Sequence, residues 1–114
     1  AGFVCDMAAM RQLADKYGFK LIEDASHAAG ASLDGYPVGS RFADASVFSF
    51  HAVKVVTSAE GGMVTTQDDA TAQRLRLLRS HGITRDSQLL SAAPEGPWIY
   101  EQLELVFNYR LTDL

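Results

Sequence analysis

Two strand-forming runs stand close together in the middle of the chain. Residues 45–50 read A-S-V-F-S-F, and Phe48 and Phe50 fall on one face at the period of two that is typical of a β-strand. Residues 63–66 form a second β-prone run after a pair of glycines. The connection between the runs is too short to contain a crossover helix, so the second strand is expected to return antiparallel to the first.

The N-terminal part of the chain has the pattern of a helix followed by a strand. Asp6 is a good N-cap for a helix that runs to about Tyr17 and ends at Gly18. Residues 19–23 follow as a short strand, apolar enough to be buried in a parallel sheet, and Asp24 stands at its C-terminal end. This unit predicts an α/β protein in which ligands bind at the carboxyl ends of the strands.

At 114 residues the chain is one domain at most. A turn is expected between residues 32 and 39, and a helix from Asp68 to about Arg79, whose acidic start and basic end suit the helix dipole. Residues 81–97 have no sustained periodicity and are expected to form a loop. The last residues read as the beginning of a helix, and both ends look cut. We therefore expect residues 1–114 to be part of a larger α/β domain, with a mostly parallel sheet and flanking helices.

Composition excludes several classes of function. The net charge is −4 and no basic run is present, which argues against nucleic acid as a partner. No uncharged segment is long enough to span a membrane, and no basic-then-apolar signal pattern stands at the N-terminus. One cysteine excludes an internal disulfide and suits a reducing cytoplasm, where we expect the protein to be located.

A single lysine, Lys54, stands among small and apolar residues in the connection between the two central strands. Val53, Val55 and Val56 flank it, and apolar neighbours would disfavour the ammonium and leave a nucleophilic amine. A Schiff-base lysine needs such an amine. A lysine on a surface loop is the alternative explanation of the same residues.

Asp24 ends one predicted strand, Ser49 lies on the next, five residues before Lys54, and Lys54 is expected in a loop at the same edge of the sheet. A lysine, a carboxylate and a hydroxyl are what pyridoxal 5′-phosphate requires for its aldehyde, its pyridine nitrogen and its phosphate. Considered separately, Asp24 could instead cap a helix, and Ser49 could fill a tight strand.

Several blocks of the sequence resemble one enzyme family. The blocks are I-E-D-A-S-H-A-A-G-A, D-A-S-V-F-S-F-H-A-V-K, T-S-A-E-G-G-M-V-T-T, L-R-S-H-G-I-T-R-D and G-P-W-I-Y-E-Q-L-E-L-V-F-N-Y-R-L-T-D-L. In this order and spacing they resemble the DegT/StrS-type nucleotide-sugar aminotransferases, and most of all the branch that serves pseudaminic-acid synthesis. The resemblance implies pyridoxal phosphate and the large domain of the aspartate-aminotransferase architecture (fold type I), of which residues 1–114 match the middle portion.

The resemblance also implies a role for individual residues. Lys54 matches the lysine that binds the cofactor, and Asp24 matches the partner of the pyridine nitrogen. His27 stands where many members have a glutamine near the cofactor ring, and Ser49 matches the phosphate-binding serine. Asn108 matches an asparagine that reaches the cofactor phosphate of the neighbouring subunit, so a homodimer is implied.

The implied reaction is transfer of an amino group to C4 of a UDP-linked 4-keto-6-deoxy sugar, with L-glutamate as donor. Two alternatives stand beside it. One is a sugar dehydratase of the same fold, in which a histidine typically replaces the lysine. The other is a non-catalytic piece, because the segments that complete the cofactor site in the family are not among these residues.

Overall fold

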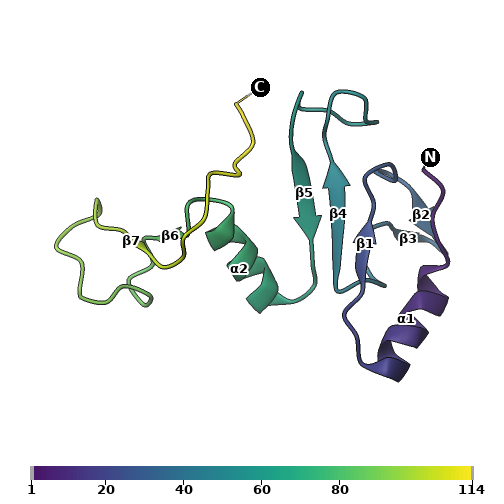
Figure 1. Cartoon of the computed structure of the whole chain (residues 1–114), viewed down its shortest axis with the longest axis horizontal. Coiled ribbons are helices and arrows are strands. Elements are labelled where there is room, and N and C mark those ends of the chain that lie inside the picture. The colour runs from purple at the N-terminus through teal and green to yellow at the C-terminus, as the bar shows by residue number, and fades with distance from the viewer. Residues whose placement is uncertain (1, 114) are drawn as a thin grey trace. The chain divides into compact units, whose positions relative to one another are not determined.

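The computed structural model describes residues 2–113 and divides them into two compact units (Figure 1). The first unit contains residues 2–72 and 111–113, and the second contains residues 73–110. Nine helices and strands lie within the described residues. They are α1 (Met7–Tyr17), β1 (Ile22–Asp24), β2 (Ser32–Leu33), β3 (Tyr36–Pro37), β4 (Ala45–Ser49), β5 (Gly62–Thr65), α2 (Asp69–Leu78), β6 (Ile83–Thr84) and β7 (Glu101–Gln102).

The first helix begins and ends where its capping residues predict. The Asp6 side chain accepts a hydrogen bond from the backbone N–H of Ala9 (3.0 Å) and so satisfies a donor that the first turn leaves unpaired. At the other end Gly18 adopts a left-handed conformation with φ 73°, and its N–H donates to the carbonyl of Ala14. Phe19 also donates to that carbonyl, so the predicted strand starts later than expected, at Ile22.

A three-stranded mixed sheet forms the centre of the first unit, in the order β1-β4-β5 (Figure 1). β1 pairs parallel to β4, with Asp24 beside Val47, and β5 pairs antiparallel to β4, with Val64 beside Val47. The antiparallel return of β5 confirms the prediction from the short connection. The expected predominance of parallel pairs is wrong for the described residues, in which β1–β4 is parallel and β2–β3, β4–β5 and β6–β7 are antiparallel.

One face of this sheet carries exposed apolar side chains. Ile22 is 68% exposed, so the expectation that β1 is buried is wrong within the described residues. Val47 and Val64 lie on the same face and are also exposed.

The tightly buried positions are Met7, Ala14, Ala25, Ser46 and Thr84. On the opposite face the Ser46 hydroxyl donates to Glu23 (2.7 Å), which pairs a buried polar group across β1 and β4.

The β2–β3 hairpin supplies the turn expected between residues 32 and 39, and its continuation packs on the sheet. A Cβ at Gly39 would lie 2.7 Å from the Phe48 ring, and the Thr65 hydroxyl donates to the Gly39 carbonyl at 2.9 Å. Gly39 also has φ 83°, a conformation that favours glycine. The residue is therefore fixed both by backbone conformation and by contact.

The second unit contains the end of α2 and a small antiparallel pair. Asp68 caps α2 by accepting a hydrogen bond from the N–H of Thr71 (2.8 Å). β6 pairs with β7, and residues 85–100 between them form turns and bends, as predicted for most of this loop. The helix expected at the C-terminal end is not formed by residues 110–113, and Leu114 lies outside the described residues. Neither helix in the described part of the chain has the length and apolar character needed to cross a membrane.

Candidate functional site

The predicted site lies at the edge of the sheet where β1 and β4 end. Asp24 is the last residue of β1 and Ser49 the last residue of β4. Because the two strands are parallel neighbours, both side chains belong to the same sheet edge. The pairing continues past β1, since the N–H of Ala25 donates to the Val47 carbonyl at 2.8 Å.

The loop after β4 brings Lys54 to the turn after β1. A β-turn closes between His51 and Lys54, whose N–H donates to the His51 carbonyl at 2.9 Å. Lys54 Nζ then lies 2.8 Å from Nε2 of His27, across 27 residues of sequence. The structure thus brings together two of the residues that the family resemblance assigns to the cofactor.

Asp24 lies close enough to both of these side chains for their charges to act on it. Hydrogen bonding from the Ser26 hydroxyl and from the Ser26 N–H (3.0 Å) lowers the pKa of Asp24; partial burial raises it, and the electrostatic interaction with Lys54 and His27 lowers it further. The carboxylate is therefore ionised at neutral pH. Asp24 caps no helix, because residues 25–31 form turns; the helix-cap alternative is wrong.

Ser26 is a residue that the sequence analysis missed. Its N–H closes a short turn on the Asp24 side chain, a motif that aspartate forms with the residue two positions later. The spacing D-x-S after a strand was the available signal. Ser26 orients the carboxylate before any ligand is present.

Ser49 is held at the end of β4 by a close backbone approach. It lies opposite Gly62 in the β4–β5 pair, and a Cβ at Gly62 would stand 2.7 Å from the carbonyl oxygen of Phe48. Beyond Ser49 the loop closes on itself, because Phe50 donates to Gly61 (2.8 Å) and accepts from Ser58 (2.9 Å). The Ser49 hydroxyl accepts a long hydrogen bond of 3.4 Å from the N–H of His51, and it is half-buried.

The valines that flank Lys54 do not shield it in the described residues. Val53 and Val55 are each 77% exposed and Val56 is 55% exposed, while Lys54 itself is only half-buried. The expected apolar shield is therefore wrong. A β-turn places successive side chains in different directions, so neighbours in sequence need not cover one another.

Asn108 lies in the second unit, and its surroundings there are local. Its Oδ1 accepts a hydrogen bond from the N–H of Arg110 (3.0 Å), and its backbone forms an isolated bridge with Ser80. The side chain is exposed.

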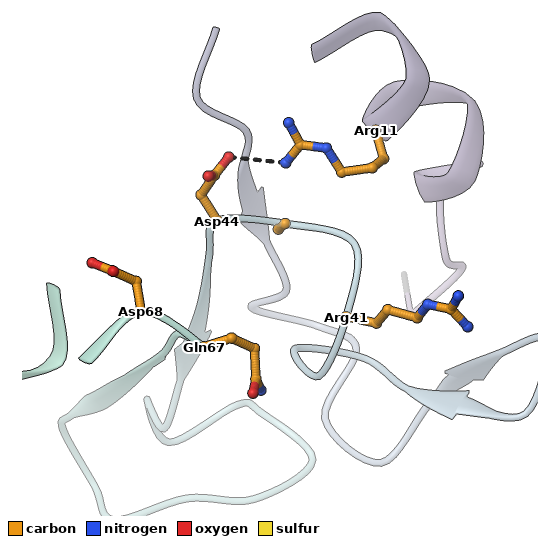
Figure 2. Close-up of a pocket in the computed structure, with 6 residues that line it drawn as sticks. Arg11, Arg41, Asp44, Gln67 and Asp68 are labelled. Carbon is orange, nitrogen blue, oxygen red and sulfur yellow. Dashed lines mark hydrogen bonds and ion pairs between the residues drawn. The ribbon is translucent and has the colours of Figure 1, made fainter. Parts of the chain in front are cut away.

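A shallow pocket of about 330 Å³ lies at the opposite end of β4 from Lys54, before the strand begins (Figure 2). Arg11 and Asp44 point toward one another across it, with 3.0 Å between Nη1 and Oδ2. Arg41 points away from this pair and lies over the Tyr36 ring at 4.1 Å. The charged groups of the pocket are thus engaged with the protein itself, and we assign it a structural role.

Comparisons with known proteins show the family of the chain. A model of the DegT/DnrJ/EryC1/StrS aminotransferase family matches residues 1–114. The chain belongs to this family, which confirms the family resemblance. An uncharacterised protein of Methanocaldococcus jannaschii is 41% identical over 114 residues, which is 100% of this chain and 29% of the relative.

Solved structures show the same fold. Helicobacter pylori PseC, an aminotransferase involved in the biosynthesis of pseudoaminic acid, is 34% identical with a TM-score of 0.82 over 96% of this chain and 27% of its own. DesI, solved in the presence of its TDP-sugar product, is 47% identical with a TM-score of 0.67 over 71% of this chain and 20% of its own. The chain therefore spans less than a third of the length of these relatives.

Proposed function

We propose that this chain is the cofactor-binding part of a pyridoxal 5′-phosphate-dependent nucleotide-sugar aminotransferase. The observation that carries the proposal is the contact between Lys54 and His27 at the sheet edge where the ionised Asp24 also lies. A cluster of lysine, imidazole and carboxylate at the carboxyl ends of parallel strands has the chemistry of this cofactor's site. Membership of an aminotransferase family supports the same reading.

The residues present fit the cofactor group by group. Lys54 supplies the amine that would hold its aldehyde carbon, and Asp24 supplies a carboxylate that stays ionised and would keep the pyridine nitrogen protonated. Ser49 supplies a hydroxyl for the phosphate at the end of β4. When bound, the cofactor supplies an electron-accepting ring that weakens the Cα–H bond of an amino acid.

Lys54 has a second task, because transamination requires a proton to be moved. Once the amino donor is bound, Lys54 Nζ would take the proton from the donor's Cα and later return it. In the net reaction L-glutamate and a keto sugar become 2-oxoglutarate and an amino sugar, in two successive half-reactions. Ping-pong kinetics are therefore expected of the whole enzyme.

For the substrate we propose a UDP-linked 4-keto-6-deoxy sugar that is aminated at C4. The enzyme would then be a UDP-4-amino-4,6-dideoxy-N-acetyl-β-altrosamine transaminase. The support is the resemblance of the blocks around Asn108 to the pseudaminic-acid branch, and the structural similarity to PseC.

We further propose a cytoplasmic homodimer in which Asn108 reaches the cofactor phosphate of the neighbouring subunit. Residues 1–114 would be part of the large domain of each subunit. The exposed position of Asn108 in the second unit is compatible with a contact to another chain.

The experiment that tests the cofactor proposal uses the purified chain and added pyridoxal phosphate. We expect a new absorbance band and, after reduction with borohydride, a label that mass spectrometry maps to Lys54. Lys16 and Lys20 are the other lysines of the chain and serve as internal controls. A Lys54→Arg variant should keep the positive charge and lose both the band and the label.

Two results would contradict the proposal for this chain. A label spread evenly over the three lysines would mean that Lys54 has no site around it, as in the alternative of a non-catalytic piece. A band with no label at Lys54 would mean that the cofactor is held elsewhere.

A sugar dehydratase has no specific support, because Lys54 is present where that class typically has histidine.

A further inference from the structure

The hydrogen bond between Lys54 and His27 joins two connections that leave the same sheet edge. The turn after β1 carries His27, and the loop after β4 carries Lys54. The pairing of Asp24 with Val47 fixes these two connections side by side. The 2.8 Å contact between Nζ and Nε2 is therefore placed by the sheet.

Among the described residues, His27 is the hydrogen-bond acceptor that faces the Lys54 amine, because the neighbouring polar groups have other partners. Asp24 takes part in a short turn with Ser26, and its charge acts on Lys54 from a distance. On the Lys54 loop itself, His51 Nε2 faces the carboxylate of Glu60 at 3.7 Å. The flanking valines are exposed and do not exclude water from Nζ.

A lysine ammonium has no lone pair and must lose a proton before it can attack a carbonyl carbon. A neutral imidazole whose proton is on Nδ1 has its lone pair on Nε2, the atom that faces Lys54. The contact therefore provides a route by which the proton can leave Nζ.

We propose that His27 is the proton acceptor for Lys54 and converts its ammonium into a nucleophilic amine. In this step one N–H bond of Nζ breaks, a bond between Nε2 and the proton forms, and the positive charge moves from Lys54 to His27. This role rests on the proposed function only in that Lys54 is the lysine that binds the cofactor. It replaces the apolar shield, expected from the sequence, as the means of activating Lys54.

The test measures the reactivity of Lys54 in the full chain without any cofactor. The probe is formaldehyde with cyanoborohydride, which methylates amines at a rate that mass spectrometry gives for each lysine. Between about pH 6 and 9, Lys54 should react about a hundredfold faster than Lys16 and Lys20, the lower end of what a positioned base contributes. A His27→Phe variant should methylate Lys54 as slowly as the other two lysines. The Lys54 rate should then depend on pH in the same way as the rates of Lys16 and Lys20.

A His27→Gln variant separates proton acceptance from simple positioning. The glutamine carbonyl can accept a hydrogen bond from Nζ but cannot take up its proton. We expect this variant to react as slowly as His27→Phe, and a rate equal to that of the unmodified chain would overturn the proposal. A His51→Gln variant is the matched control, since it removes a histidine from the Lys54 loop that does not face Nζ, and its Lys54 rate should be unchanged.

The outcomes distinguish this inference from the proposed function. If Lys54 is activated toward formaldehyde but takes no label from pyridoxal phosphate, the inference holds and the cofactor proposal fails for this chain. If pyridoxal phosphate labels Lys54 and the His27 variants methylate at the normal rate, the cofactor proposal holds and the inference fails. The rates at Lys16 and Lys20 and the circular dichroism spectrum report whether each variant is folded.

Discussion

Ser49 lies directly opposite Gly62 in the antiparallel pair of β4 and β5, at the point where β4 reaches the candidate site. The close approach is between backbones, because a Cβ at Gly62 would stand 2.7 Å from the carbonyl oxygen of Phe48. The Ser49 hydroxyl therefore keeps its position only if residue 62 has no side chain. Glycine is needed here for space, since its φ lies outside the left-handed region.

A Gly62→Ala substitution should consequently disturb both stability and the site. The added methyl group would push β5 away from β4, and overpacking of this kind costs about 1–3 kcal/mol of unfolding free energy. Displacement of Ser49 should also weaken the binding of pyridoxal phosphate more than that of pyridoxal, which has no phosphate. Chemical denaturation and absorbance titrations measure the two effects.

The control for this substitution is Gly35→Ala in the β2–β3 hairpin. Gly35 has φ 81° and no atom within 4 Å of an added Cβ, so the variant pays only for backbone conformation, about 1–2 kcal/mol. Cofactor binding should then be unchanged. If Gly62→Ala bound both compounds normally, Ser49 would have no role in holding the phosphate.

An Asp24→Asn substitution tests the assignment of the carboxylate. The side chain keeps its size and can still accept from the Ser26 N–H, but it loses the charge that would keep a pyridinium nitrogen protonated. Affinity for pyridoxal phosphate should fall about tenfold or more, as expected when a hydrogen bond to a charged group is lost. A Glu60→Gln variant, which removes a carboxylate from the Lys54 loop, should bind normally. Equal affinity of Asp24→Asn and the unmodified chain would contradict the assignment.

The elements that the sequence predicted are those whose determinants are local. Asp6 and Gly18 define α1 because capping depends on residues within one turn of the helix ends. The antiparallel return of β5 followed from the length of one connection. The sequence also placed Asp24 at the end of one strand and Ser49 on the next, because strand periodicity and the position of a polar residue after an apolar run are local too.

The features that the sequence did not predict depend on distant pairing. The β6–β7 pair joins Ile83 to Gln102, 19 positions apart, through strands of only two residues each. The contact between His27 and Lys54 depends on the turns after two different strands, and neither turn conformation follows from the residue pattern. The exposure of Ile22 was not predicted. An apolar strand indicates that another segment should pack on it, but it does not indicate which segment does so.

Acid should destabilise the first unit through Asp44. The N–H of Leu21 (2.8 Å), then Lys20 and Arg11, hold the pKa of this carboxyl far below its ordinary range. Because the pKa is lower in the folded chain than in the unfolded chain, its contribution to stability is complete above about pH 4 and is lost as the pH falls toward the folded-state pKa. Thermal unfolding followed at a series of pH values should therefore show a falling Tm below about pH 4.

An Asp44→Asn variant should show a smaller decrease in Tm on acidification and a Tm lower by about 5 °C or more at neutral pH. Part of the acid dependence should remain, because the pKa values of Asp24 and Asp68 are lowered as well. Lys20→Gln is the control: the Lys20 side chain is 85% exposed, and exposed ion pairs contribute little to stability. An unaltered acid profile in Asp44→Asn would show that the contacts of Asp44 do not stabilise the fold.

The proposed action of Asn108 on a neighbouring subunit can be tested by mixing two inactive variants of the chain. Lys54→Ala lacks the amine, and Asn108→Ala lacks the amide that is proposed to contact the partner's phosphate. If Asn108 acts between subunits, each mixed dimer contains one complete site out of two. Half of the dimers are mixed in an equimolar mixture that has exchanged subunits, so about one site in four should bind pyridoxal phosphate tightly.

Sedimentation velocity measures whether the chains associate, and a monomer at all concentrations would contradict the dimer. A dimeric mixture that binds no better than the separate variants would show that Asn108 serves the site of its own subunit or none. The decisive comparison is therefore between the mixture and its two components at the same total concentration, because only an exchange of Asn108 between chains raises the mixture above both.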